Sequence, residues 1–236
     1  MSQASDRSAG HVLIIGASRG LGYALADEYL KRGRHVVATT RGSARTPLHE
    51  RLATASGRLE IETVDINRPE QAAAMHARLR GRRFDLLFVN AGVKNDDHET
   101  VADVSTDEFV RVLVTNALSP MRMIETCLDL VAPAGTICAM SSGLGSVANN
   151  ESGGYEVYRA SKASLNTLMR SFAARHSTDA RTLLLLAPGW VRTDMGGPEA
   201  TLSVEESIPN LVDVIEQQSG KPGLQYLNYQ GRTVPW

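Results

Sequence analysis

The sequence contains very little cysteine. Cys127 and Cys138 are the only two thiols in 236 residues, and they do not stand at a metal-ligand spacing. The six histidines form no H-x-x-H or H-E-x-x-H pattern. We therefore expect no metal site and two buried free thiols in place of a disulfide framework.

Long apolar runs and an excess of charge of one sign are also missing. No apolar run approaches the ~20 residues needed to span a bilayer, so no membrane partner is expected. Residues 1–10 are polar and lack the apolar stretch of a signal peptide. They predict a disordered tail on a cytoplasmic protein. The sequence has 25 Lys and Arg against 26 Asp and Glu. Because this charge is balanced, it does not attract nucleic acid, and no nucleic-acid partner is expected.

Short apolar runs alternate with longer amphipathic ones over residues 11–236. The runs rich in branched residues predict strands at 11–15, 35–39, 59–64, 84–89, 136–140, 183–187 and 225–229. Helices are expected at 21–32, 68–80, 105–131, 156–176 and 203–218. Capping boxes are expected at two starts, because Ser105 and Ser203 each precede Glu by three residues.

This alternation predicts an α/β fold in a single domain covering residues 11–236. Strands separated by helices form βαβ units, whose right-handed crossovers place helices on both faces of the sheet. The expected architecture is a doubly wound (Rossmann) parallel sheet of about seven strands. Ligands bind such sheets at the carboxyl ends of the strands. The polar, glycine-rich residues 145–154 should form a flexible loop beside that edge.

A glycine-rich segment joins the first expected strand to the first expected helix. Gly16 allows a tight turn, Gly20 lets the backbone approach a pyrophosphate, and Gly22 lets the helix pack close to the sheet. The helix N-terminus offers free N–H groups and the positive end of its dipole. The segment therefore predicts a dinucleotide site, in which Ser18 and Leu21 also contact the cofactor.

The end of the second strand indicates which dinucleotide binds. An NAD-specific site carries Asp or Glu there, whereas this chain has Thr40 followed by Arg41. A guanidinium can hold a 2′-phosphate that a carboxylate would repel. Arg19, inside the glycine loop, is a second cation near the same place. The pattern predicts NADP(H); the alternative is that both arginines are solvated surface residues.

Tyr158 and Lys162 stand four residues apart in an expected helix. Residues at i and i+4 share a face, so phenol and ammonium can point into one cleft. A free tyrosine has a pKa near ~10, and a nearby cation lowers it. Alone, the pair could be a helix surface pair. Ser141 and Ser142 strengthen the catalytic interpretation, because they follow the fifth strand and place a hydroxyl at its carboxyl end.

Together these segments resemble the short-chain dehydrogenase/reductase family. The G-x-x-x-G-x-G spacing, Ser142 and the Tyr158–Lys162 pair occur in the family order, as do Asn116 and the N-A-G segment at 90–92. The resemblance implies that Ser142 hydrogen-bonds the substrate carbonyl and that Tyr158 is the acid/base. It also implies that Lys162 holds the nicotinamide ribose and that Asn116 completes a proton relay.

The resemblance implies further cofactor contacts along the chain. Asp65 would bind the adenine amine, although it could equally be a turn former, and Thr193 would contact the nicotinamide carboxamide. The complete set of implied contacts outside the glycine loop and the second strand is Asp65, Ile66, Asn90, Ala91, Gly92, Tyr158, Lys162, Pro188, Gly189, Val191, Thr193 and Met195.

The segments around 140–143 and 189–195, with the short ending 228–236, are similar to the C-factor and sniffer-type carbonyl reductase branch. That likeness implies NADP(H)-dependent reduction of a small-molecule ketone or aldehyde to an alcohol. It also implies a homodimer or homotetramer that pairs through helices 105–131 and 156–176. The alternative is a nucleotide-binding signalling or regulatory protein of C-factor type with little turnover.

Overall fold

Seven apolar runs of the chain lie side by side in one sheet. The computed structural model describes residues 10–236, in which the strand order is β3-β2-β1-β4-β5-β6-β7 and all neighbours are parallel. The strands are β1 His11–Ile15, β2 His35–Thr40, β3 Leu59–Thr63, β4 Phe84–Val89, β5 Val131–Met140, β6 Thr182–Ala187 and β7 Gly223–Asn228.

The connections between these parallel strands are helical. The helices are α1 Gly20–Lys31, α2 Pro47–Arg51, α3 Pro69–Leu79, α4 Thr106–Leu113, α5 Ser119–Cys127, α6 Glu156–Arg175 and α7 Val204–Gln218. Four short turns complete the set: η1 Leu52–Thr54, the π-helical η2 Val114–Leu118, η3 Leu128–Leu130 and η4 Gly143–Gly145. Parallel strands need such crossovers, because a tight hairpin reverses the chain.

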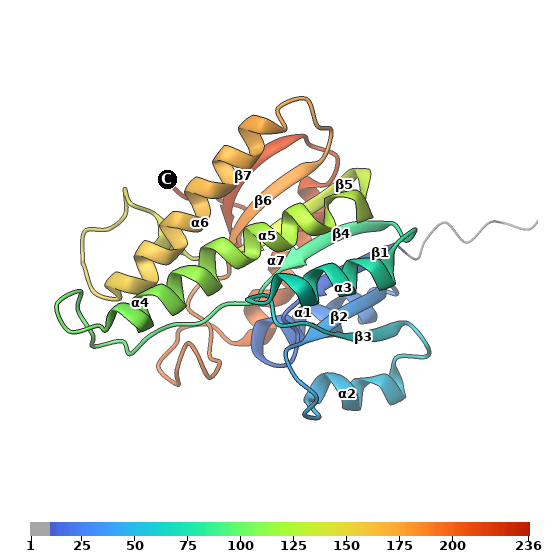
Figure 1. Ribbon diagram of the computed structural model, residues 1–236, viewed down its shortest axis with the longest axis horizontal. Coiled ribbons are helices and arrows are strands. Elements are labelled where there is room, and N and C mark those ends of the chain that lie inside the picture. Colours follow the sequence, from blue (N-terminus) through green and yellow to red (C-terminus); the bar gives the residue numbers. More distant parts are fainter. Residues whose placement is uncertain (1–9) are drawn as a thin grey trace, which may run out of the picture.

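The sheet separates two apolar cores. Successive strand residues point to opposite faces, so Leu13 and Ile15 join one cluster while Val12 and Ile14 join the other. Helices α1 and α7 pack on one face, whereas α3, α5 and α6 cover the face turned towards the viewer in Figure 1. The predicted single-domain, doubly wound sheet of seven strands is thereby confirmed.

The strand order reverses direction beside β1. From β1 the chain moves outward to β2 and β3, and then returns to place β4 on the other side of β1. Crossovers that leave in opposite directions open a crevice at the carboxyl ends of the strands between them. This crevice is where the predicted site residues should meet.

The expected single helix over 105–131 is wrong in detail. The segment contains α4, the π-helical η2, α5 and η3, and Val131 already belongs to β5. Strand β5 therefore begins earlier than the predicted residue 136. Pro133 and Gly135 concealed its first half, which pairs through Val131 with Phe84 before the register shifts.

Smaller differences concern helix ends and short elements. Helix α2 was not predicted, because its five residues are too few to show a periodicity. The expected capping box at Ser203 is present, since Ser203 and Glu206 bond each other's backbone N–H. At Ser105 only half of the box forms, because the Glu108 side chain pairs with Arg111.

Beyond β7 the chain turns back along its own last strand. Leu227 and Thr233 form an antiparallel bridge, and Val234 N donates to the Tyr226 carbonyl at 2.9 Å. The ring of Trp236 packs on Tyr226, with centroids 5.5 Å apart. The end of the chain accordingly lies beside α6 in Figure 1.

Three further expectations concern features outside the sheet. Cys127 and Cys138 are free and buried, as predicted. Residues 1–9 of the expected disordered tail lie outside the described residues. Within residues 10–236, none of the helices combines the length and apolarity that crossing a bilayer requires.

Candidate active site

A cleft of about 880 Å³ runs along the carboxyl ends of the central strands. Nearly all the predicted site residues line it: Gly16, Ser18, Arg19, Gly20, Leu21, Thr40, Arg41, Asp65, Ile66, Asn90, Ala91, Gly92, Ser142, Tyr158, Lys162, Pro188, Gly189, Val191, Thr193 and Met195. Gly22 and Asn116 are buried behind the lining. The fold thus brings together residues that are as much as 179 positions apart.

The glycine loop packs so closely that two of its positions have no room for a side chain. A Cβ on Gly22 would lie 2.0 Å from the Gly16 carbonyl oxygen, and a Cβ on Gly16 would lie 2.8 Å from Ala91. Gly16 also has φ +89°, which L side chains rarely adopt. Asn90 Nδ2 donates to the Gly16 carbonyl at 2.8 Å. The N-A-G segment therefore holds the loop in place at the start of α1.

The cations near β2 differ in their surroundings. Arg41 is exposed, lines the cleft, and makes no side-chain hydrogen bond within the described part of the chain. Thr40 is buried, and its hydroxyl donates to the Gly42 carbonyl at 3.3 Å. Arg19 Nη1 lies 2.5 Å from Asp194 Oδ2, an ion pair that joins the glycine loop to the segment after β6. Both members are 74% exposed, so the pair contributes little stability.

Asp65 lies in the cleft wall and also shapes its own turn. Its Oδ1 accepts from Asn67 N at 3.0 Å, and its backbone N–H donates to Gln71 Oε1 at 2.8 Å. The turn-forming interpretation therefore describes a real contact. It does not exclude an adenine contact, because a carboxylate has further acceptor sites.

The two serines after β5 are in different environments. Ser141 is buried, and its hydroxyl donates to Asn166 Oδ1 at 2.7 Å. Ser142 lines the cleft, and its Oγ accepts from Leu144 N at 3.2 Å. The Ser142 hydroxyl thus borders both the cleft and Tyr158, whereas the proton of Ser141 is committed to Asn166.

Tyr158 and Lys162 meet on the face of α6 that borders the cleft. Lys162 Nζ lies 5.7 Å from the centroid of the Tyr158 ring and donates to the Met140 carbonyl at 2.9 Å. Burial lowers the pKa of Lys162 to about 8. Burial also raises the pKa of Tyr158 to about 12, against a hydrogen bond with Ser142 that lowers it. Both shifts follow from desolvation, which disfavours whichever form is charged.

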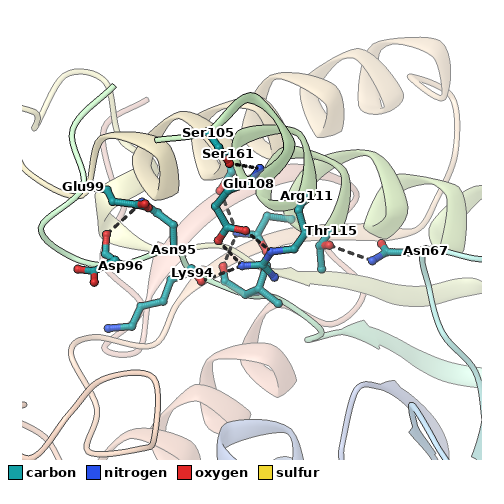
Figure 2. A network of polar contacts seen from close by, with 12 residues as sticks. Asn67, Lys94, Asn95, Asp96, Glu99, Ser105, Glu108, Arg111, Thr115 and Ser161 are labelled. Atoms are coloured by element: carbon teal, nitrogen blue, oxygen red, sulfur yellow. Dashed lines mark hydrogen bonds and ion pairs between the residues drawn. The ribbon is translucent and has the colours of Figure 1, made fainter. Parts of the chain in front are cut away.

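Asn116 projects from the π-helical turn η2 between α4 and α5. Its Oδ1 accepts from Val93 N at 2.8 Å, and its Nδ2 donates to Val93 O and to Ser161 Oγ at 2.7 and 2.9 Å. Figure 2 shows the contacts around this turn, including Thr115 Oγ1 accepting from Asn67 Nδ2 at 3.0 Å. π-Helical turns recur at functional sites, and this one ties α6 to the segment that follows β4.

A segment just before α6 forms one wall of the cleft. Gly153, Gly154 and Tyr155 have φ of +64°, +67° and +52° in succession, and Tyr155 lines the cleft. Arg159, only 8% exposed, donates to the Gly154 and Gly153 carbonyls at 2.9 and 3.0 Å, and to Ser152 Oγ at 3.2 Å. One buried guanidinium therefore anchors this end of the expected loop.

Among the residues at the site that the sequence analysis did not predict, three make contacts that shape it. Trp190 is 50% exposed and lines the cleft, and its Nε1 donates to the Gly196 carbonyl at 2.7 Å. Asn166 holds Ser141, and Tyr226 donates to the Ser142 carbonyl. Helical spacing could have indicated Asn166, which lies four residues after Lys162 on the same face. No local signal indicates Tyr226.

The chain matches the family model for short chain dehydrogenases over residues 10–201. A short-chain dehydrogenase/reductase from Burkholderia multivorans, solved with bound NADP, is 56% identical with a TM-score of 0.95, covering 97% of this chain and 100% of that one. The carbonyl reductase Sniffer of D. melanogaster is 29% identical with a TM-score of 0.87, covering 97% and 100%. C-signal of Myxococcus xanthus is 36% identical over 154 residues, which are 64% of this chain and 92% of that protein.

These similarities include the segments that build the cleft. The family match contains the glycine loop, the N-A-G segment, Ser142 and the Tyr158–Lys162 pair. The structural likeness extends over almost the whole chain. The chain therefore belongs to the short-chain dehydrogenase/reductase family of oxidoreductases, in the branch that contains C-signal and the Sniffer carbonyl reductase.

Proposed function

We propose that this protein reduces a ketone or aldehyde to an alcohol with NADPH, using Tyr158 as its acid/base. One observation carries the proposal: Tyr158 lies in the cleft beside both the Ser142 hydroxyl and the Lys162 ammonium. A binding protein has no need of a phenol placed between a hydroxyl donor and a buried cation. The NADP-bound relative from Burkholderia multivorans supports the same cofactor here.

The cleft fits a dinucleotide phosphate at two places. Gly16 and Gly22 let the loop pack tightly, because a Cβ at either position would collide with backbone, and Gly20 lets the loop backbone approach a pyrophosphate. Arg41 is exposed at the end of β2 and can pair with a 2′-phosphate. When bound, NADPH supplies the hydride that the carbonyl carbon accepts.

Side chains of the protein hydrogen-bond and protonate the carbonyl oxygen of the substrate. Ser142 donates a hydrogen bond to it and so stabilises the charge that develops there. Tyr158 donates the proton that completes the alcohol. Protonated Lys162 stabilises the phenolate that remains, at about 1.4 kcal/mol for each pKa unit by which it lowers the pKa of Tyr158.

Asn116 is proposed to connect Lys162 to solvent through a water molecule. A Cβ on Gly92 would lie 3.3 Å from Asn116 Oδ1 and 3.5 Å from Lys162 Nζ, so both polar atoms border the same small space. The Oδ1 that accepts from Val93 N retains a second acceptor site. It can therefore hold a water that returns a proton to Tyr158.

The decisive experiment combines cofactor binding with turnover. Fluorescence titration should show tighter binding of NADPH than of NADH, and Arg41→Glu should remove that preference. Tyr158→Phe should lower kcat on an active carbonyl compound by about 10²-fold or more, with NADPH affinity retained. Equal affinity for the two cofactors would overturn the assignment to NADP, and an active Tyr158→Phe variant would overturn the role of Tyr158.

A second candidate function follows from the similarity to C-signal, which is 36% identical over 154 residues. Under this second candidate function, the chain is a nucleotide-binding signalling or regulatory protein with little turnover. The two candidates differ in one measurable respect: this one predicts NADPH binding without oxidation by any member of a broad carbonyl panel.

We also propose that the protein forms a homodimer or homotetramer through α4, α5 and α6. Four apolar side chains on or between these helices remain at least 39% exposed: Phe109, Val110, Leu118 and Leu168. Light scattering after size exclusion should give a mass of two or four chains, and Leu168→Arg should reduce it. A monomeric wild-type protein would contradict the proposal.

A further inference from the structure

Three consecutive residues at the end of β5 are each held by a side chain from another element. The Met140 carbonyl accepts from Lys162 Nζ at 2.9 Å, and the Ser141 hydroxyl donates to Asn166 Oδ1 at 2.7 Å. The Ser142 carbonyl accepts from the Tyr226 hydroxyl. The first two partners come from α6, whereas Tyr226 comes from β7, two strands away in the sheet.

Burial and ring packing hold the side chain of Tyr226 in one position. Its side chain is 1% exposed, and its ring packs on that of Trp236 with 5.5 Å between centroids. Burial raises the pKa of Tyr226, so the phenol remains a proton donor. Its hydroxyl is a second donor to the Ser142 carbonyl, which also accepts from Gly145 N at 2.9 Å.

We infer that Tyr226 is a positioning residue for Ser142, an inference that rests on the proposed reductase function. The Ser142 carbonyl and side chain are attached to one Cα, so holding the carbonyl fixes the backbone position from which Oγ projects towards Tyr158. Leu144 N restrains the same residue at Oγ, at 3.2 Å. Small displacements of a reacting group cost a large part of the rate, so this restraint acts on turnover and not on cofactor affinity.

The test variant is Tyr226→Phe, which removes the hydroxyl and keeps the ring that packs on Trp236. The matched control is Tyr29→Phe on α1, in the other core. Tyr29 is 3% exposed, and its buried hydroxyl has no hydrogen-bond partner within residues 10–236. Both changes delete one buried phenolic oxygen, but only the first touches Ser142.

The kinetic measurement is a double-mutant cycle with Ser142→Ala. Tyr226→Phe should lower kcat by about tenfold in the wild-type background, with KM and NADPH affinity nearly unchanged. In the Ser142→Ala background it should lower kcat by less than about twofold, because the group that it positions is absent. Tyr29→Phe should leave kcat unchanged in both backgrounds. Equal losses in the two backgrounds would overturn the inference.

Hydrogen exchange supplies a measurement that needs no turnover. Tyr226→Phe should accelerate exchange of the amides of residues 143–146, because Gly145 N bonds the same carbonyl, and Tyr29→Phe should not. Unchanged exchange would overturn the inference even if the enzyme is active. Absence of turnover in the wild-type protein would instead reject the proposed function, while the exchange result would still decide the role of Tyr226.

Discussion

Lys162 is a cation buried without a carboxylate partner in the described part of the chain. Its side chain is 3% exposed, and its ammonium bonds the Met140 carbonyl. Its pKa of about 8 and the Tyr158 pKa of about 12 show that the surroundings favour the neutral form of both groups. The proposed acid/base role of Tyr158 therefore depends on keeping Lys162 protonated.

The buried ammonium should appear in the pH dependence of stability. The folded pKa of Lys162 is lowered from 10.5 to about 8, so between these values the unfolded chain binds a proton that the folded chain lacks. The free energy of unfolding that depends on Lys162 therefore rises with pH across this window. Below about pH 8 the folded state carries the full cost of the buried charge.

Comparison with Lys162→Met isolates this effect in the ligand-free protein. From about pH 7 to about pH 9.5, wild type should gain about 2 kcal/mol relative to the variant. Tyr158 affects stability only above this pH range, because its pKa is raised from 10.0 in the unfolded chain to about 12 in the folded one. Its contribution to the free energy of unfolding is lost as the pH rises between these two values. Urea unfolding at the two pH values measures the difference, and a constant difference would contradict the assignment.

At the scale of elements, α6 carries two of the proposed catalytic residues, Tyr158 and Lys162, and Asn166, which supports the segment beside them. Tyr158, Lys162 and Asn166 follow at four-residue intervals on one face, and all three reach the end of β5 or the cleft. The opening turn of α6 carries Arg159, which anchors residues 152–154. One helix thus presents Tyr158 and Lys162 to the cleft and also holds the adjoining segment, whose Tyr155 forms part of the cleft wall.

Arg159→Met should loosen that wall without removing a catalytic group. The change breaks the three hydrogen bonds from the guanidinium to residues 152–154, which costs about 1–3 kcal/mol of stability. We expect KM for a carbonyl substrate to rise and protease cleavage within 146–155 to accelerate. Arg175→Met, on the exposed end of the same helix, is the matched control. Equal protease resistance of the two variants would exclude the anchoring role.

The glycine loop and α1 form a second sensitive unit. Gly22→Ala places a Cβ 2.0 Å from the Gly16 carbonyl oxygen, so backbone must move. NADPH affinity should fall by at least about tenfold, with a stability loss of about 1–3 kcal/mol. Gly42→Ala is the control, because its Cβ would meet open space. Fluorescence titration and thermal unfolding measure both quantities; an unaffected Gly22→Ala variant would contradict the close packing.

Elements with a strong periodic pattern were predictable, and those whose pattern is broken were not. The apolar runs of β1 and β6 are continuous because both faces of these strands are buried. The first half of β5 contains Pro133 and Gly135, which argue against a strand. The π-helical turn η2 has no signature in the spacing of its apolar residues.

The candidate site was predictable where its residues form local motifs. The glycine loop, the N-A-G segment and the Tyr158–Lys162 pair each occupy a few neighbouring positions. The contact between Ser142 and Tyr226 spans 84 positions, and only the order β5-β6-β7 brings the two residues together. Arg19 shows a further limit, since its ion pair with Asp194 depends on a loop 175 positions away.

At the scale of the whole molecule, the cleft is lined by residues from the loop after β1 through to the segment after β7. A ligand that binds only the folded state stabilises it through mass action. NADPH at about 100 times its Kd should add about 2.7 kcal/mol, which raises Tm by roughly 5–10 °C for a chain of this size. NADH at the same concentration should raise Tm less, and Arg41→Glu should remove the difference. A larger shift with NADH would reverse the proposed preference.

The antiparallel return of the chain along β7 has a consequence for behaviour in concentrated solution. A parallel sheet ends in strands whose unpaired N–H and C=O groups can recruit strands from other molecules. Residues 233 and 234 occupy part of that edge on β7, through the bridge of Thr233 to Leu227 and the bond of Val234 N to Tyr226 O. Val234 also lines the cleft, so the short stretch that borders the candidate site also covers part of an edge at which another chain could pair.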